Sequence, residues 1–176
     1  MLSPRAGMTG GLFGRPFLFE MEPSLILLRL NKESPKKCSL TPLRQRQDLP
    51  VRWIHCALGE RVEIGDAVLL HPEGELLSPQ DQDLPLLLID SSWRDLPRVL
   101  RGVQGDLRLR RLPNGLQTAY PRRSTTFQDP SNGLASIEAL HAACAMLGRR
   151  DDSLLDGYYW AEEYLRLNAD LLASPA

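Results

Sequence analysis

The sequence predicts an α/β protein, and three observations lead to that fold class. Short apolar runs recur along the chain between polar turns, and the most continuous of them is residues 86–90. A run without polar alternation is typical of a strand that is covered on both faces. Apolar residues at helical spacing follow from residue 134 onward. Strands that are separated by helices and long loops indicate a sheet with helices packed on it.

The first half of the chain predicts a tail followed by strands and turns. Residues 1–23 carry four glycines and three prolines without a hydrophobic period, which predicts a loosely held tail. We expect strands at residues 25–30, 51–56 and 67–70, the last ending before a turn at Glu73 and Gly74. Three further segments are a turn-rich basic loop, a short helix interrupted by Pro42, and a loop or short helix start, at residues 31–39, 40–47 and 76–81.

The second half predicts the central strand and the helices. Residues 86–90 form the strand, and a short helical stretch runs from Trp93 to Leu100. Residues 107–112 alternate Leu with Arg, as in an edge strand or an exposed extension, and residues 113–133 form a long loop of the kind that is often functional.

Two helices complete the predicted fold. The first begins near residue 134 with Ser136 as its cap and ends at Gly148. Its apolar face contains Ile137, Leu140, Cys144 and Leu147. A last helix is expected from residue 156 to residue 172, with a stripe of aromatic and leucine side chains that belongs to the core.

The composition is that of an ordinary globular chain with a local excess of positive charge. Of its 176 residues, 43% are apolar and 24% are charged, and the formal net charge is −1. A chain of this length buries roughly 70% of the surface that it exposes when unfolded. Between Arg94 and Arg123, however, eight arginines stand against two acidic residues. Such a stripe attracts a phosphate backbone, although an ordinary solvated face would have the same composition.

The cysteines and the apolar runs bear on the compartment. Cys38, Cys56 and Cys144 have no paired spacing, which argues against a disulfide framework and for a reducing compartment. We expect no metal site, because the chain has no Cys-x-x-Cys. No apolar run approaches about 18 residues, and the N-terminus lacks the apolar core of a signal peptide. We therefore expect a cytoplasmic protein with no segment that spans a membrane.

Asp90 is the first candidate for chemistry, because it ends the central strand. Ligands bind at the carboxyl ends of the strands in open parallel sheets, and Asp90 lies at that edge. A carboxylate in this place is as often a helix cap or a loop brace as a catalytic group. Position alone therefore leaves both roles open.

Four stretches, taken in their order along the chain, resemble one family. They are Ser-Pro-Lys-Lys-Cys-Ser, Leu-Leu-Ser-Pro-Gln-Asp, Ile-Asp-Ser-Ser-Trp, and Leu-Pro followed by Leu-Ala-Ser-Ile-Glu-Ala, at residues 34–39, 76–81, 89–93, 112–113 and 134–139. Together with the Tyr-Tyr-Trp-Ala-Glu-Glu-Tyr tail, they resemble the small-subunit rRNA aminocarboxypropyltransferases of ribosome biogenesis. The resemblance covers residues 25–172.

The resemblance implies a single-domain SPOUT-like knotted sheet with flanking helices, and S-adenosylmethionine as its cofactor. Enzymes of this family transfer the 3-amino-3-carboxypropyl group to N3 of a modified pseudouridine. On this basis we expect a flexible tail at residues 1–23, an N-terminal part of the transferase at 24–58, and a SPOUT-like part at 59–176 that packs with it as one unit. We expect a monomer whose partner is small-subunit rRNA or a pre-ribosomal subunit.

Carried over by position, the resemblance implies a set of cofactor contacts. They are Ser39, Leu70, Pro72, Ile89, Trp93, Leu112 and Ser136. Ser39 would hold the methionine carboxylate, and Asp90 would be the base. The start of a helix suits a ligand carboxylate, which supports Ser136, although a plain cap would look the same. Ser39 could likewise be a solvated turn residue and Trp93 a core residue.

The substrate is less closely defined by the resemblance than the cofactor. We expect RNA contacts from the arginine stripe at Arg108, Arg110, Arg111, Arg122 and Arg123. The sequence departs from the family at Ser91, where Cys is usual, and in the loop at residues 114–133. Asp-Ser-Ser-Trp and residues 133–139 are also similar to the tRNA-uridine aminocarboxypropyltransferases. A tRNA enzyme and a non-catalytic RNA-binding assembly module are therefore the alternatives.

Overall fold

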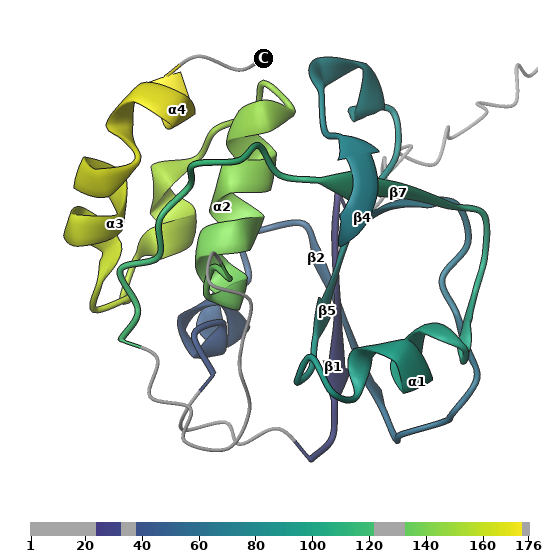
Figure 1. Ribbon diagram of the computed structural model, residues 1–176. Coiled ribbons are helices and arrows are strands. Elements are labelled where there is room, and N and C mark those ends of the chain that lie inside the picture. Colours follow the sequence, from purple (N-terminus) through teal and green to yellow (C-terminus); the bar gives the residue numbers. More distant parts are fainter. Residues whose placement is uncertain (1–23, 33–37, 122–132, 174–176) are drawn as a thin grey trace, which may run out of the picture.

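A five-stranded parallel sheet forms the centre of the protein (Figure 1). The computed structural model describes residues 24–32, 38–121 and 133–173. In spatial order, the strands are β2 (Val51–Cys56), β1 (Leu25–Leu30), β5 (Leu86–Asp90), β4 (Ala67–Leu76) and β7 (Leu107–Arg111). Every pairing between neighbours is parallel. The α/β prediction is therefore confirmed, and the predicted tail at residues 1–23 lies outside the described residues.

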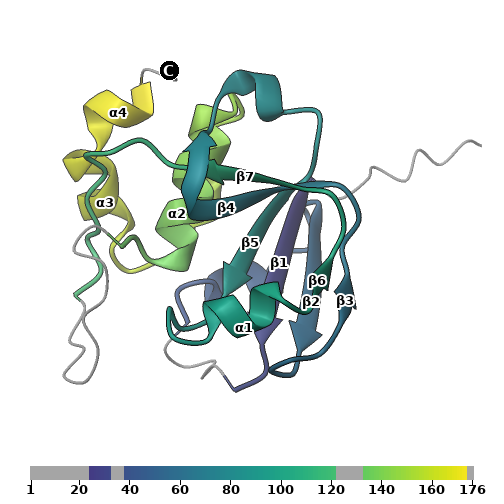
Figure 2. The same cartoon turned by 45° about the vertical axis from the view of Figure 1, so that its right-hand side comes forward.

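Both faces of the sheet are covered, which explains why β1 and β5 are almost wholly apolar. On one face, Leu27 and Leu88 pack with helix α2 (Ser136–Met146). On the other, Leu28 and Leu87 pack beneath helix α1 (Leu96–Leu100) and the small sheet of β3 (Val62–Glu63) and β6 (Val103–Gln104). Figures 1 and 2 show α2 and α1 on opposite sides of the sheet.

Helix α2 is buried on nearly all sides. The predicted face of Ile137, Leu140, Cys144 and Leu147 is buried, and so are Ala142, Ala143 and Ala145 on its other sides. Small side chains allow the sheet and the C-terminal helices to approach the helix closely. Gly148 follows the last turn with a φ of 74°, as expected of a residue that ends a helix in the left-handed conformation.

Two predicted elements are wrong. The last helix does not run from 156 to 172. It is replaced by helix α3 (Ala161–Leu167) and helix α4 (Ala169–Ala173), and a 3-10 turn η4 (Asp152–Leu155) precedes them. Gly157, with a φ of 76°, interrupts it first. The side chain of Asn168 donates to the carbonyl of Tyr164 and interrupts it again.

The turn expected at Glu73 and Gly74 is instead part of β4, which continues to Leu76. Gly74 lies so close to β7 that an added Cβ would stand 2.5 Å from the backbone nitrogen of Arg110. Glycine is therefore needed here for the close approach of two strands rather than for a turn. The short segments at 40–47 and 76–81 contain 3-10 turns, η2 (Thr41–Gln45) and η3 (Pro79–Asp81).

His141 gives the fold a predictable dependence on pH. Its side chain is fully buried in α2, and its Nε2 lies 2.9 Å from Oδ1 of Asp152. Burial lowers the pKa of His141 below its ordinary value of 6.5, although Asp152 partly opposes that shift. The folded protein therefore binds this proton less readily than the unfolded chain does.

We expect the free energy of unfolding to hold steady above about pH 7 and to fall as the pH drops below about 6.5, by up to roughly 1.4 kcal/mol per pH unit. Denaturant titrations at a series of pH values measure this. His141→Gln should flatten the profile in that window. A wild-type profile that is flat from pH 7 to pH 5.5 would contradict this assignment.

Candidate active site

Asp90 and Arg29 form a charge pair at the carboxyl ends of the two central strands. Leu86 and Leu88 point toward α2, so the alternation of β5 places Asp90 on the same face. In β1, Arg29 is the register partner of Asp90. Arg29 is only 2% exposed, and its Nε lies 3.8 Å from Oδ2 of Asp90. The buried guanidinium of Arg29 therefore faces the carboxylate of Asp90 at the ends of the two strands.

Two further side chains brace Asp90 from distant parts of the chain. The hydroxyl of Ser136, at the start of α2, donates to Oδ1 at 2.8 Å. The thiol of Cys38 donates to Oδ2 at 3.2 Å. Burial and the negative charge of Asp90 raise the pKa of Cys38 to about 11, so Cys38 is a protonated donor and not a thiolate nucleophile.

The first turn of α2 is not capped by Ser136, which the sequence predicts as its cap. The structure makes Ala135 the N-cap, and Ser136 turns its hydroxyl to Asp90 instead, so the prediction of Ser136 as the cap is wrong. The hydroxyl of Ser39 accepts a hydrogen bond from the backbone N–H of Ile137 at 3.2 Å. Ser39 and Ser136, predicted to act together, are thereby brought to one helix end.

Glu138 is the residue of this region that the sequence reasoning undervalued. Its side chain is fully buried and accepts four hydrogen bonds. The donors are the backbone N–H groups of Ala135 and Ala119 and the hydroxyls of Thr118 and Tyr158. Glu138 therefore fastens the segment after β7 and the C-terminal region to the start of α2. A Glu at the third position of a helix is a known capping signal, which could have revealed the first of these bonds.

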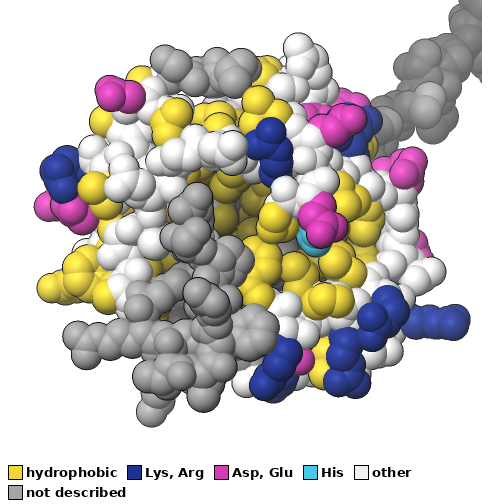
Figure 3. Space-filling model, viewed as in Figure 1, with side chains coloured by type: hydrophobic (Ala, Val, Ile, Leu, Met, Phe, Trp, Pro, Cys, Tyr) yellow, Lys and Arg dark blue, Asp and Glu magenta, His cyan; other side chains and the backbone are white. Residues whose placement is uncertain are grey.

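The other predicted cofactor contacts lie in or directly after β5, β4 and β7. Leu69 pairs in register with Leu87 and with Leu109, but β4 then continues to Leu76 and its later pairs are with β7. Ile89 therefore lies near the carboxyl end of β5, Leu70 and Pro72 lie within β4, and Leu112 follows β7. This face of the molecule is hollowed beside α2, and hydrophobic side chains line the hollow (Figure 3).

These residues do not all face the same side of the sheet. Leu70 and Leu112 pack against the core cluster that contains α2. Ile89 packs against the opposite cluster, so a ligand on the α2 side could meet only its backbone. Pro72 is exposed, and Trp93 is half-buried in the turn between β5 and α1.

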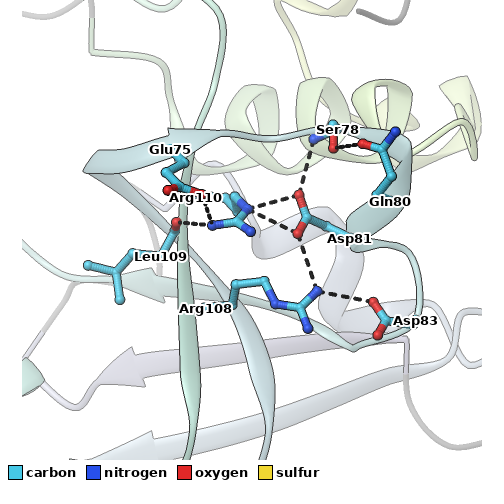
Figure 4. Close-up of polar contacts among 8 residues, drawn as sticks. All are labelled: Glu75, Ser78, Gln80, Asp81, Asp83, Arg108, Leu109 and Arg110. Carbon is cyan, nitrogen blue, oxygen red and sulfur yellow. Dashed lines mark hydrogen bonds and ion pairs between the residues drawn. The ribbon is translucent and has the colours of Figure 1, made fainter.

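Two of the five arginines predicted to bind RNA are engaged in ion pairs (Figure 4). The carboxylate of Asp81, which is 3% exposed, accepts from Nε of Arg110 at 2.9 Å and from Nη1 of Arg108 at 3.3 Å. Arg108 also pairs with Asp83, and Arg110 with Glu75. Burial opposes the ionisation of Asp81, but the hydrogen bonds from Arg110 outweigh it and lower the pKa of this carboxyl. These pairs hold the end of β4 to β7.

The remaining predicted arginines are placed only in part. Nη1 of Arg111 lies 3.5 Å from the carbonyl oxygen of Leu112. Arg122 and Arg123 lie outside the described residues. Within residues 24–32, 38–121 and 133–173, no group of three His, Cys, Asp or Glu side chains could hold a metal ion. In the same ranges, no helix is long and apolar enough to cross a membrane.

A cavity of about 270 Å³ adjoins the polar cluster on the side of the C-terminal region. Cys38 and Ser39 form part of its wall, and the aromatic side chains of Tyr120, Tyr158 and Trp160 form much of the rest. The polar cluster thus has a mainly apolar and aromatic surface on one side and the ends of the strands on the other.

The fold and this cluster define a class of protein, an α/β protein with a candidate ligand site at the carboxyl edge of a parallel sheet. Comparison with known proteins narrows the class. A family model described as "Ribosome biogenesis protein, C-terminal" matches residues 68–175. The 16S rRNA aminocarboxypropyltransferase of Halobacterium salinarum is 32% identical over 143 residues, which are 80% of this chain and 79% of that protein.

A solved structure is similar as well. It is that of the SAM-dependent rRNA acp-transferase from Vulcanisaeta distributa, with a TM-score of 0.64 and 27% sequence identity over 87% of this chain and 82% of that one. The chain belongs to the ribosome biogenesis family of small-subunit rRNA aminocarboxypropyltransferases. The predicted family is thereby confirmed.

Proposed function

We propose that this protein transfers the 3-amino-3-carboxypropyl group of S-adenosylmethionine to N3 of a uridine or pseudouridine in small-subunit rRNA, during ribosome biogenesis. The observation that carries the proposal is the convergence of Ser136 and Cys38 on the carboxylate of Asp90, with the hydroxyl of Ser39 on the first turn of α2 beside them. The similarity to proteins named as aminocarboxypropyltransferases supports this reaction as the one that the arrangement serves.

The residues present suit S-adenosylmethionine. Hydroxyls at a helix N-terminus are suited to a carboxylate such as that of the methionine moiety, because the helix dipole is positive there. Leu70, Leu112 and the backbone at Pro72 and Ile89 offer a partly apolar wall for the adenosine, and we propose Trp93 as a further packing contact.

Asp90 is proposed as the base of the reaction. Bound at this site, S-adenosylmethionine would supply a carbon that its positively charged sulfur activates: N3 of the nucleobase would bond to this carbon as the carbon–sulfur bond breaks and methylthioadenosine leaves. The carboxylate of Asp90 accepts the proton that leaves N3. Arg29, Ser136 and Cys38 hold that carboxylate in one orientation. Ser136 therefore has two candidate roles, which are holding the methionine carboxylate and positioning Asp90.

Replacing Ser136 by Ala separates these roles. If the hydroxyl holds the methionine carboxylate, the variant should bind S-adenosylmethionine about fivefold more weakly or worse, the effect of losing about 1 kcal/mol. Isothermal titration measures this directly. Unchanged affinity with slower transfer would assign the hydroxyl to Asp90 instead, and unchanged affinity with a lower melting temperature would make it a structural contact.

The RNA contacts of the proposed enzyme include the arginines in and after β7. Arg108 and Arg110 attract an RNA phosphate less strongly than a free arginine does, because their ion pairs with Asp81, Asp83 and Glu75 compensate part of their positive charge. We therefore propose Arg111, Arg122 and Arg123 as the stronger contributors among the five, through counterion release on binding phosphate.

The finer features of the fold and setting remain part of this proposal. We propose that the chain forms a single SPOUT-like unit in which the described sheet is knotted around the cofactor. The parallel sheet and the likeness to the Vulcanisaeta distributa structure support it. We further propose that the protein is monomeric and acts in the cytoplasm on a pre-ribosomal subunit. Sedimentation of the purified protein with and without pre-ribosomal particles tests both the monomer and the partner.

A further inference from the structure

Helix α1 presents an amphipathic pattern with arginines on its outer side. Val99 is 4% exposed and packs against the core on that face of the sheet, with Leu100 beside it. Arg94, Arg98 and Arg101 are all exposed. Their spacing of four and three residues along continuous turns places them on one side. Lys and Arg side chains gather on the surface over α1 (Figure 3). We call Arg94, Arg98 and Arg101 the arginine face.

The charge of the arginine face is not neutralised within the described part of the chain. None of the three arginines forms an ion pair with a described carboxylate, in contrast to Arg108 and Arg110. The acid of the same segment, Asp95, is buried and pairs with Lys32. Asp95 also interacts electrostatically with Arg94, so Arg98 and Arg101 are the two exposed positive charges of the segment that form no ion pair with a described carboxylate.

The arginine face follows the candidate active site in the chain, and α1 lies on the face of the sheet opposite to α2. Helix α1 begins six residues after Asp90, following a single turn at residues 91–95, so it extends from the same carboxyl edge of the sheet. Arg98 lies in α1, while Arg94 lies in the turn before it and Arg101 directly follows it. Three exposed guanidinium groups within eight residues suit contacts with neighbouring phosphates of one RNA strand.

We propose that the arginine face binds consecutive phosphate groups of the RNA next to the nucleotide that is modified. This proposal rests on the proposed function for its choice of RNA as the ligand. Phosphate contacts set the position of a nucleic acid without reading its sequence. The arginine face would therefore hold the RNA backbone while the target base reaches Asp90. The basic stripe of the second half of the chain would then divide into two parts, with α1 contacting RNA and β7 mostly pairing internally.

The test compares two double variants that each remove two positive charges. Arg98→Ala with Arg101→Ala removes the arginine face while leaving Arg94, which lies nearest to Trp93 and Asp90. The control is Arg52→Ala with Arg166→Ala. Both of its residues are exposed, and they lie at the amino end of β2 and on α3. Affinity for an unmodified transcript of small-subunit rRNA is measured between about 50 and 200 mM salt.

We expect the Arg98/Arg101 variant to bind the transcript at least about tenfold more weakly at low salt. Its plot of log affinity against log salt should be shallower by about one unit per arginine lost. The control should retain the wild-type slope, and Arg98→Lys with Arg101→Lys should restore most of the binding. Equal affinity of wild type and the Arg98/Arg101 variant for the transcript would contradict RNA binding by the arginine face. An equal loss of affinity in both double variants would contradict it as well.

The proposed function is tested separately on the same samples. Suppose that the wild-type protein transfers label to the transcript but that its affinity does not depend on Arg98 and Arg101. This result would support the proposed activity and contradict RNA binding by the arginine face. Salt-dependent binding through these arginines without transfer would support the interface and contradict the proposed activity. Unchanged S-adenosylmethionine affinity and melting temperature in the variants show that the site and the fold are intact.

Discussion

Replacing Asp90 by Asn should reduce aminocarboxypropyl transfer by about 100-fold or more, with little change in the affinity for S-adenosylmethionine. The amide keeps the shape of the side chain but cannot accept the proton from N3, and loss of a general base has this scale. Single-turnover transfer measures the rate, and titration calorimetry measures the binding. Transfer at the wild-type rate would contradict the base assignment and leave Asp90 as a brace between β5 and α2.

The same substitution should also lower stability, because it removes the carboxylate that lies 3.8 Å from Nε of the buried Arg29. Removing one partner of a buried charge pair typically costs about 3–5 kcal/mol, and removing both costs much less. Arg29→Gln combined with Asp90→Asn should therefore recover much of the stability without recovering transfer. Recovery of transfer in this double variant would show that Asp90 acts only by balancing Arg29.

Replacing Glu138 by Ala should also lower stability strongly. It removes the acceptor of four hydrogen bonds, which come from two backbone N–H groups and the hydroxyls of Thr118 and Tyr158. Each unpaired buried group costs about 1–3 kcal/mol, and relaxation recovers part of it. We expect a loss of about 3 kcal/mol or more. For a chain of this size, that lowers the melting temperature by roughly 6–12 °C.

Differential scanning calorimetry measures this change, with two reference variants. Glu138→Gln keeps one acceptor oxygen and should lose less than the Ala variant. Glu162→Ala removes an exposed carboxylate from α3 and should shift stability by no more than about 0.5 kcal/mol. A melting temperature for Glu138→Ala equal to that of Glu162→Ala would show that Glu138 does not hold the segment after β7 in place.

The parts of the fold that the sequence could predict are those with a local signal. The apolar runs of β1 and β5 and the helical period of α2 come directly from burial on both faces or on one face. The carboxyl-edge position of Asp90 follows from the same reasoning. The pairing of Asp90 with Arg29 could not be predicted in this way. Arg29 lies in an apolar run, and only the register between β1 and β5 places it beside Asp90.

The features that the sequence could not reveal depend on contacts between distant residues. The sequence reveals the charge of the segment at 94–123 but not which arginines meet an acid, so the pairing of Arg110 with Asp81 was not foreseeable. Asn168 is equally compatible with a continuous helix until its side chain is seen to bind the backbone of Tyr164 and Gln117. Ser136 looks like a cap in sequence, yet its hydroxyl binds a carboxylate that lies 46 residues earlier in the chain.

The most direct test of the central claim is the fate of two labels in S-adenosylmethionine. The protein is incubated with small-subunit rRNA and tRNA, and with donor labelled either in the carboxypropyl carbons or in the methyl group. We predict that the carboxypropyl label enters small-subunit rRNA, that mass spectrometry finds it on N3 of a uridine or pseudouridine, and that the methyl label stays out of RNA. Label in tRNA alone would assign the protein to a different substrate, and donor binding with no label in any RNA would contradict the claim that it is a transferase.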